Sequence, residues 1–177
     1  MTRTNSNKPR NPAGRDPAPL SAVFDGHCTL EIPDVEAPPL GDRYPLRSDI
    51  VFSPARDAVT LRQLDEITTP RYETDLGPAR VKNSTTVRLT SAEPGRLSRD
   101  GHFAIPVVLR FDHSVDVPLY QEDSDLPVTL STRGAGGAPL DAKGKVVLVG
   151  EGTFRGGALH GKRCTLTYAG RVSPLPW

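Results

Sequence analysis

The side chains best able to do chemistry in this sequence are four histidines and one run of carboxylates. The histidines are His27, His102, His113 and His160. None of them stands at metal-ligand spacing from another, and the sequence contains no HxH, HExxH or CxxC motif. We therefore expect no metal centre and no other cofactor.

Acidic residues gather around His113, in a stretch from 112 to 125 that contains no lysine or arginine. Carboxylates beside a histidine can orient the imidazole or share a cation with it. The segment 122–125 has the oxygen density that Ca²⁺ prefers, but it lacks the glycine and the distal glutamate of an EF-hand loop. A solvated acidic loop is the alternative interpretation. The candidate acidic patch consists of Asp112, His113, Asp116, Glu122, Asp123 and Asp125.

Nucleophilic catalysis has no support in the sequence. No serine lies in a GxSxG context. Neither Cys28 nor Cys164 belongs to a recognised catalytic motif, so nothing indicates an activated thiolate. The glycine-rich stretch 150–157 is not a GxGxxG fingerprint, and no helix pattern follows it. We therefore expect no enzymatic activity and assign no catalytic residue.

The same stretch, GEGTFRGG, is similar to the glycine-spaced strands of dirigent and allene-oxide-cyclase barrels. The similarity is confined to these residues. The acidic residues that such enzymes need have no counterpart here, so the resemblance implies no activity for this chain.

The composition favours a single all-β domain. Hydrophobic residues make up 36% of the 177, and the chain contains 16 glycines and 18 prolines. Helix-period stretches are absent and turn residues recur at short intervals, which is typical of a β-sandwich or a β-barrel. A net charge of +1 gives no overall field that would attract a polyanion, so nucleic acid is not an expected partner.

The strongest strand pattern runs from Phe103 to Asp112, where large apolar residues occupy every second position. Side chains alternate between the two faces of a strand, so this pattern predicts one apolar face. That face lines either a packed core or a cavity for an apolar ligand. Pro106 lies on the opposite face and lacks an N–H, which predicts a sheet edge or a bulge there. The apolar face consists of Phe103, Ile105, Val107, Leu109 and Phe111.

A β-hairpin is predicted over residues 144–174, with glycines 156, 157 and 161 at its turn. Its return strand places Cys164, Leu166 and Tyr168 on one face. Cys28 has a similar context in the first predicted strand, 20–32. In a barrel the first and last strands would pair, so we expect both cysteines to be buried near each other, as free thiols rather than a disulfide.

The remaining segments complete an antiparallel fold of about eight to ten strands. Residues 46–52, 85–90, 115–120 and 126–130 read as strands, and 68–81 and 131–143 read as loops. Residues 58–67 fit a strand better than a helix, although Ser53-Pro54 is also a helix-start signal. Residues 1–19, with four basic residues and four prolines, read as a flexible basic arm before an all-β domain at 20–177.

These observations predict a non-catalytic β-sandwich or barrel that acts as a binding or structural-accessory module. Two alternatives remain: a small barrel that holds an apolar molecule as a carrier, cyclase or isomerase, and a coat-like assembly subunit. A protein partner or a small apolar ligand is the expected partner. The N-terminal residues show no signal-peptide pattern, so we expect a cytoplasmic location, or secretion if a signal peptide has been removed. No long apolar run occurs, so we expect no transmembrane segment.

Overall fold

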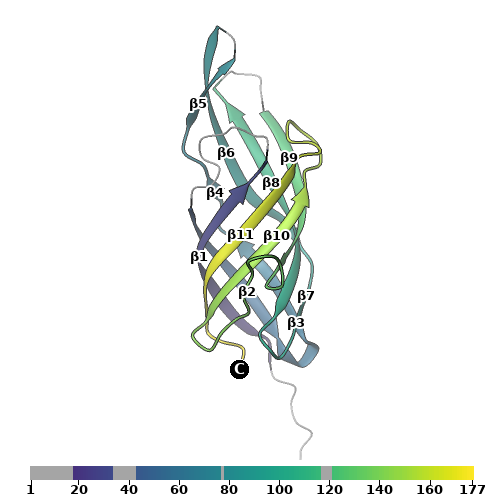
Figure 1. Cartoon of the computed structure of the whole chain (residues 1–177). Coiled ribbons are helices and arrows are strands. Elements are labelled where there is room, and N and C mark those ends of the chain that lie inside the picture. The colour runs from purple at the N-terminus through teal and green to yellow at the C-terminus, as the bar shows by residue number, and fades with distance from the viewer. Residues whose placement is uncertain (1–17, 34–42, 77, 117–120) are drawn as a thin grey trace, which may run out of the picture.

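The computed structural model describes residues 18–33, 43–76, 78–116 and 121–177 (Figure 1). The predicted arm at 1–19 lies almost entirely outside these ranges, and its two described residues, Ala18 and Pro19, are exposed. The described chain is built of antiparallel strands with one short 3₁₀ helix, η1 (Pro54–Arg56). The strands are β1 (Leu20–Glu31), β2 (Tyr44–Ser53), β3 (Ala58–Leu64), β4 (Ile67–Thr68), β5 (Tyr72–Leu76), β6 (Ala79–Ala92), β7 (Gly95–Leu97), β8 (Phe103–Val115), β9 (Gln121–Ser131), β10 (Lys145–Thr153) and β11 (Arg163–Ser173).

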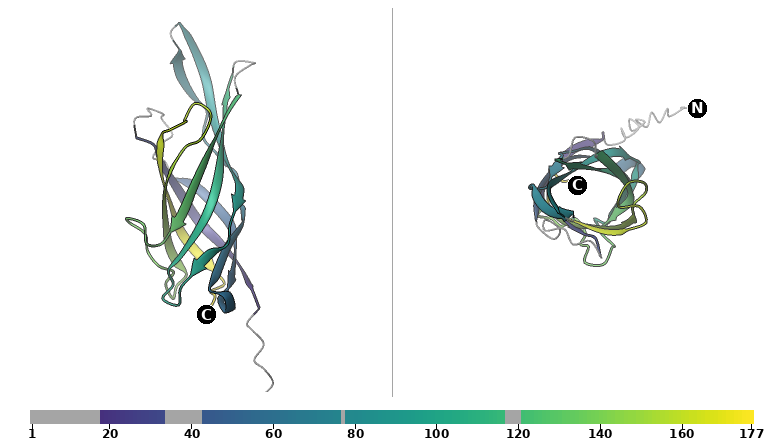
Figure 2. Two further views of the ribbon diagram at one scale, coloured as in Figure 1. Left: turned by 90° about the vertical axis from the view of Figure 1, so that its right-hand side faces the viewer. Right: turned by 90° about the horizontal axis from the view of Figure 1, so that it is seen from above.

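Eight of these strands close into an antiparallel barrel, which decides between the sandwich and the barrel expected from the sequence. The ring runs β8-β7-β3-β2-β1-β11-β10-β9, and β9 pairs again with β8. Seen from above, the strands form a closed ring (Figure 2). β6 runs along β8 on the same side as β7, and β4 and β5 pair with β6. Apart from the β3–β7 pair and the closing β1–β11 pair, each strand of the ring neighbours those next to it in sequence, as in an up-and-down barrel.

The apolar interior confirms the strand pattern predicted for β8. Its five alternating large residues are between 0% and 3% exposed, whereas Ala104, Arg110 and Asp112 are only partly buried. Phe103 contacts Phe52 edge to face, with 6.0 Å between ring centroids, and Phe111 contacts Phe154 at 4.8 Å. The apolar face is therefore part of a packed core formed by residues from all around the ring.

Two inward-facing glycines on β10 make room for β9. A Cβ atom at Gly150 would lie 2.5 Å from Val128 Cγ2, and one at Gly152 would lie 2.8 Å from Leu126 Cδ1. Small residues on β10 thus complement large residues on β9, which keeps the interior filled at normal packing density. This explains the alternating glycines of the predicted hairpin.

The first and last strands pair, as expected. β1 and β11 are antiparallel, with Cys28 opposite Tyr168. Cys164 lies four residues before Tyr168, an offset of roughly 13 Å along the strand. Both cysteines are free and buried, and burial raises the pKa of each thiol to about 12. The β1–β11 register therefore does not place the two cysteines opposite each other, which explains why both are free thiols.

Several sequence predictions need correction. Residues 68–81 are not a loop, because they contain β5 and the start of β6. Residues 115–120 do not form a separate strand as far as they are described: Val115 ends β8, and 117–120 lie outside the described residues. Residues 58–67 are extended, so the helix alternative is wrong.

Pro106 does not mark a sheet edge, since β8 has neighbours on both sides. It lies opposite the break between β6 and β7, where Glu93 N–H donates to its carbonyl oxygen at 3.0 Å. The local irregularity predicted at this proline is therefore on the neighbouring strand. None of the helical segments in the described residues is long and apolar enough to cross a membrane.

Candidate functional site

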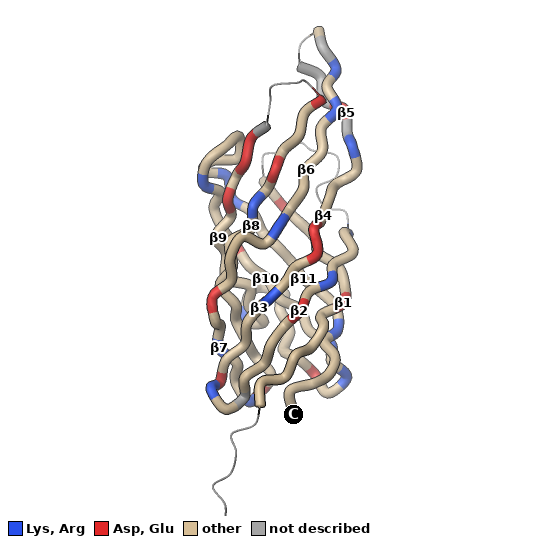
Figure 3. The backbone as a smooth tube through the Cα atoms, turned by 180° about the vertical axis from the view of Figure 1, so that it is seen from behind, with Lys and Arg blue, Asp and Glu red and all other residues tan. Residues whose placement is uncertain are grey.

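The candidate acidic patch is divided by the pleat of β8 and β9. Asp112 and Asp125 point outward, where each pairs with an arginine. Arg110 Nε donates to Asp125 Oδ1 at 2.9 Å, and Arg88 donates to the carboxylate of Asp112. Asp116 and Asp123 are exposed. The outward carboxylates are thus either neutralised or solvated. Figure 3 shows that the acidic backbone positions of β8 and β9 are spread along the two strands rather than gathered at one point.

His113 and Glu122 share the inner face of the barrel and lie opposite each other across β8 and β9. Thr85 Oγ1 lies 2.9 Å from His113 Nδ1. Burial lowers the pKa of His113, although the charges of Glu122, Asp112 and Asp123 oppose the shift. His113 Nε2 and Glu122 Oε2 are buried without a hydrogen-bond partner. Among the described residues, no group of three or more His, Cys, Asp or Glu side chains is placed to bind a metal ion.

Acid should destabilise the barrel through His113. Its pKa is lower in the folded protein than in the unfolded chain, where a histidine has a pKa of about 6.5. The unfolded chain therefore binds more protons as the pH falls below about 6.5, so the stability present above that value is progressively lost. Urea titrations at pH 7.5 and 5.5 should show a smaller loss for His113→Asn than for the parent. Equal losses in both proteins would contradict this assignment, because the other histidines are common to both.

A different set of side chains lines a groove at the opposite end of the barrel, where η1 and the β7–β8 and β9–β10 connections meet. The groove has a volume of about 610 Å³. We call it the arginine groove, because four arginines but only one carboxylate line it. Its lining residues are Arg56, Asp57, Arg96, Leu97, Ser98, Arg99, His102, Phe103, Ala104, Ser131 and Arg133.

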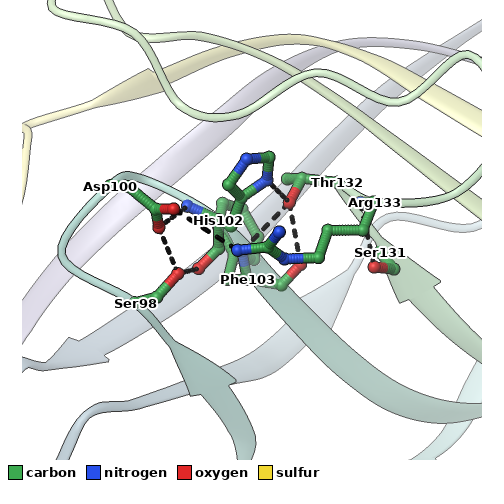
Figure 4. A network of polar contacts seen from close by, with 7 residues as sticks. All are labelled: Ser98, Asp100, His102, Phe103, Ser131, Thr132 and Arg133. Carbon is green, nitrogen blue, oxygen red and sulfur yellow. Dashed lines mark hydrogen bonds and ion pairs between the residues drawn. The ribbon is translucent and has the colours of Figure 1, made fainter.

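Hydrogen bonds fix the β7–β8 connection that forms one wall of the arginine groove (Figure 4). Ser98 Oγ donates to the Asp100 carboxylate and also lies 2.8 Å from the carbonyl oxygen of His102. The bond from Ser98, with the backbone N–H of His102 and the charge of Arg133, lowers the pKa of Asp100. The connection is therefore a defined wall rather than a loose loop.

Thr132, the residue that follows β9, anchors the same wall. Phe103 N–H donates to Thr132 Oγ1 at 3.1 Å, and His102 Nδ1 lies 2.9 Å from the same oxygen (Figure 4). Thr132 is 2% exposed, so this anchor is sheltered from water. The contact with Thr132 engages Nδ1 of His102.

The arginines of the groove differ in how they are neutralised. Arg133 pairs with Asp100, with 3.3 Å between Nη2 and Oδ2. The ion pairs found among the described residues do not involve Arg56, Arg96 or Arg99, and all three are exposed. The groove thus presents guanidinium groups in excess of carboxylates, which suits a ligand with negative charge.

The sequence predictions did not identify this groove. Its arginines come from segments that are far apart in the sequence. The described residues of the acidic stretch at 112–125 lie at the opposite end of the barrel (Figure 3). The signal available was topological: residues 53–57 and 99–101 have turn-forming sequences, SPARD and RDG, and alternate turns of an up-and-down barrel lie at one end. Arg56 and Arg99 belong to these two turns.

Compared with known proteins, the chain matches no family model, no curated protein and no solved structure. The class defined by the fold is an antiparallel up-and-down β-barrel.

Proposed function

We propose that this barrel is a non-catalytic binding module that holds an anionic ligand in the arginine groove. The observation that carries the proposal is that Arg56, Arg96 and Arg99 surround one hollow of about 610 Å³ and form no ion pair with any residue that the structure describes. Unpaired cations gathered in a concave site raise the local concentration of anions.

The geometry of arginine supports recognition of an oxyanion. A guanidinium is always charged and presents a planar fork of donors that matches a carboxylate or a phosphate. The arginines here are exposed, so their attraction is screened by salt within a Debye length of about 10 Å at 0.1 M. We therefore expect modest affinity that weakens as ionic strength rises.

The hydroxyl groups at the arginine groove are engaged in structural hydrogen bonds. Ser98 is committed to Asp100 and to the loop backbone, and His102 Nδ1 contacts Thr132. The carboxylate of Asp100 is a poor general base for Ser98, because its pKa is lowered, and the Thr132 hydroxyl beside His102 is shielded from solvent at 2% exposure. Binding without reaction is thus the better-supported role for these side chains.

A barrel that holds an apolar molecule in its interior has less support. The five residues that would line such a cavity are at most 3% exposed and pack against neighbouring side chains. A ligand there would have to displace that packing.

The proposal is tested by calorimetric titration with pyrophosphate at about 20 mM and about 200 mM salt. We expect saturable binding that weakens at the higher salt concentration. Arg96→Ala/Arg99→Ala should weaken it by about tenfold or more, since hydrogen bonds to charged groups contribute about 1.5–3 kcal/mol.

The matched control is Arg62→Ala/Arg163→Ala, which removes the same charge from exposed positions outside the groove. It should change the affinity by less than about twofold, because distant surface charges interact weakly through salt water. An equal loss in both double variants would mean that only net charge matters. That result, or the lack of saturable binding, would overturn the proposal.

A further inference from the structure

A second hollow adjoins the arginine groove and extends it towards the C-terminal tail. It has a volume of about 260 Å³. It shares Asp57, Leu97, Ser98 and Arg99 with the arginine groove and adds Pro176 and Trp177. The two hollows are therefore continuous through shared residues, with Arg99 on both.

Trp177 is the aromatic side chain that lines this second hollow. It is 59% exposed, and it is the one large hydrophobic side chain found exposed among the described residues. An indole at the edge of a hollow can stack on another ring while its N–H stays hydrated.

The tail that carries Trp177 is held against the barrel. Leu175 is partly buried and packs on the core, and the C-terminus lies at the end of the barrel that carries β3 and β7 (Figure 1). Pro176 restricts the backbone immediately before Trp177. The indole is thus presented beside the arginines by an anchored segment.

We propose that the anionic ligand is an aromatic phosphate monoester, with its ring against Trp177 and its phosphate among Arg96, Arg99 and Arg56. The inference rests on the proposed function and adds that the anionic ligand carries an aromatic ring. A phosphate suits the site better than a single carboxylate, because a dianion can engage more than one guanidinium fork. Leu97 and Pro176 complete an apolar surface around the ring.

The chain contains a single tryptophan, so its intrinsic fluorescence at 295 nm excitation reports on Trp177 alone. The test compares phenyl phosphate with methyl phosphate, which carries the same charged group without the ring. Phenyl phosphate should change the emission and bind about three- to tenfold more tightly, as aromatic contacts of this kind contribute. Methyl phosphate should bind with a smaller spectral change.

The matched variant is Trp177→Leu, with affinities measured by calorimetry because the fluorophore is lost. It should reduce the affinity for phenyl phosphate to that for methyl phosphate and leave methyl phosphate binding unchanged. If the parent binds both esters equally, or if the variant keeps the preference for the ring, the inference is wrong while anion binding stands. If the parent binds neither ester, the proposed function itself fails.

Discussion

Replacing Leu109 with alanine should lower the free energy of unfolding by about 2–5 kcal/mol. The side chain is 0% exposed in the middle of β8. Its cross-strand neighbours are Leu89 on β6 and Leu126 on β9. Truncation removes buried methyl groups and leaves a cavity that two pairs of hydrogen-bonded strands cannot readily collapse around. A urea titration at pH 7.5 measures the loss.

The matched control is Val108→Ala, one position away on the outer face of the same strand. Val108 is only partly buried and borders a surface groove, so its truncation should cost clearly less than that of Leu109. Equal losses at the two positions would contradict the inward orientation of Leu109. A Leu109→Ala protein as stable as the parent would do the same.

The register of β8 could be predicted from sequence because its signal is local. Phe103, Leu109 and the other members of the apolar face repeat with the period of the pleat, so a single shift would expose all of them. The pairing of β1 with β11 was also predictable, since a barrel has no other neighbour for its terminal strands. Both features depend on which side chains are buried, and the alternation of apolar residues in the sequence indicates this directly.

The β5–β6 hairpin was not predictable by the same means. Residues 72–76 read YETDL, and β6 begins with ARVKN, so charged and polar residues dominate both strands. The hairpin pairs Tyr72 with Asn83 and Leu76 with Ala79 through backbone hydrogen bonds. Backbone pairing is available to any sequence, so a strand held mainly by it leaves no apolar alternation to detect.

The acidic patch shows how closeness in sequence misleads in a strand. Asp112 and His113 are adjacent, and for that reason their side chains leave opposite faces of β8. Glu122 joins His113 because it lies directly across the ladder. The arginine groove is the opposite case. Its residues are distant in sequence, and they meet because alternate turns lie at the same end of the barrel.

The closing contact between β1 and β11 should be the least tolerant of an added side chain. Gly26 and Gly170 face each other across it. A Cβ atom at Gly26 would lie 2.3 Å from the Ala169 carbonyl oxygen and 2.6 Å from Gly170 Cα. One at Gly170 would lie 2.4 Å from the Asp25 carbonyl oxygen. These neighbours are backbone atoms, which cannot rotate away as a side chain can.

Gly26→Ala should therefore destabilise the barrel by about 3 kcal/mol, the upper part of the range for overpacking. Relief requires β1 and β11 to separate, and each of these strands has its other edge fixed, to β2 and to β10. Compared with the parent, the Gly26→Ala variant should show accelerated hydrogen exchange at the amides around Gly26 and Gly170. The amides of β8 and β9 should be accelerated less. Ser21→Ala, at an exposed position on β1, is the control and should stay within about 0.5 kcal/mol of the parent. A Gly26→Ala protein with parental stability and unchanged exchange would show that the two strands do not approach as closely as described.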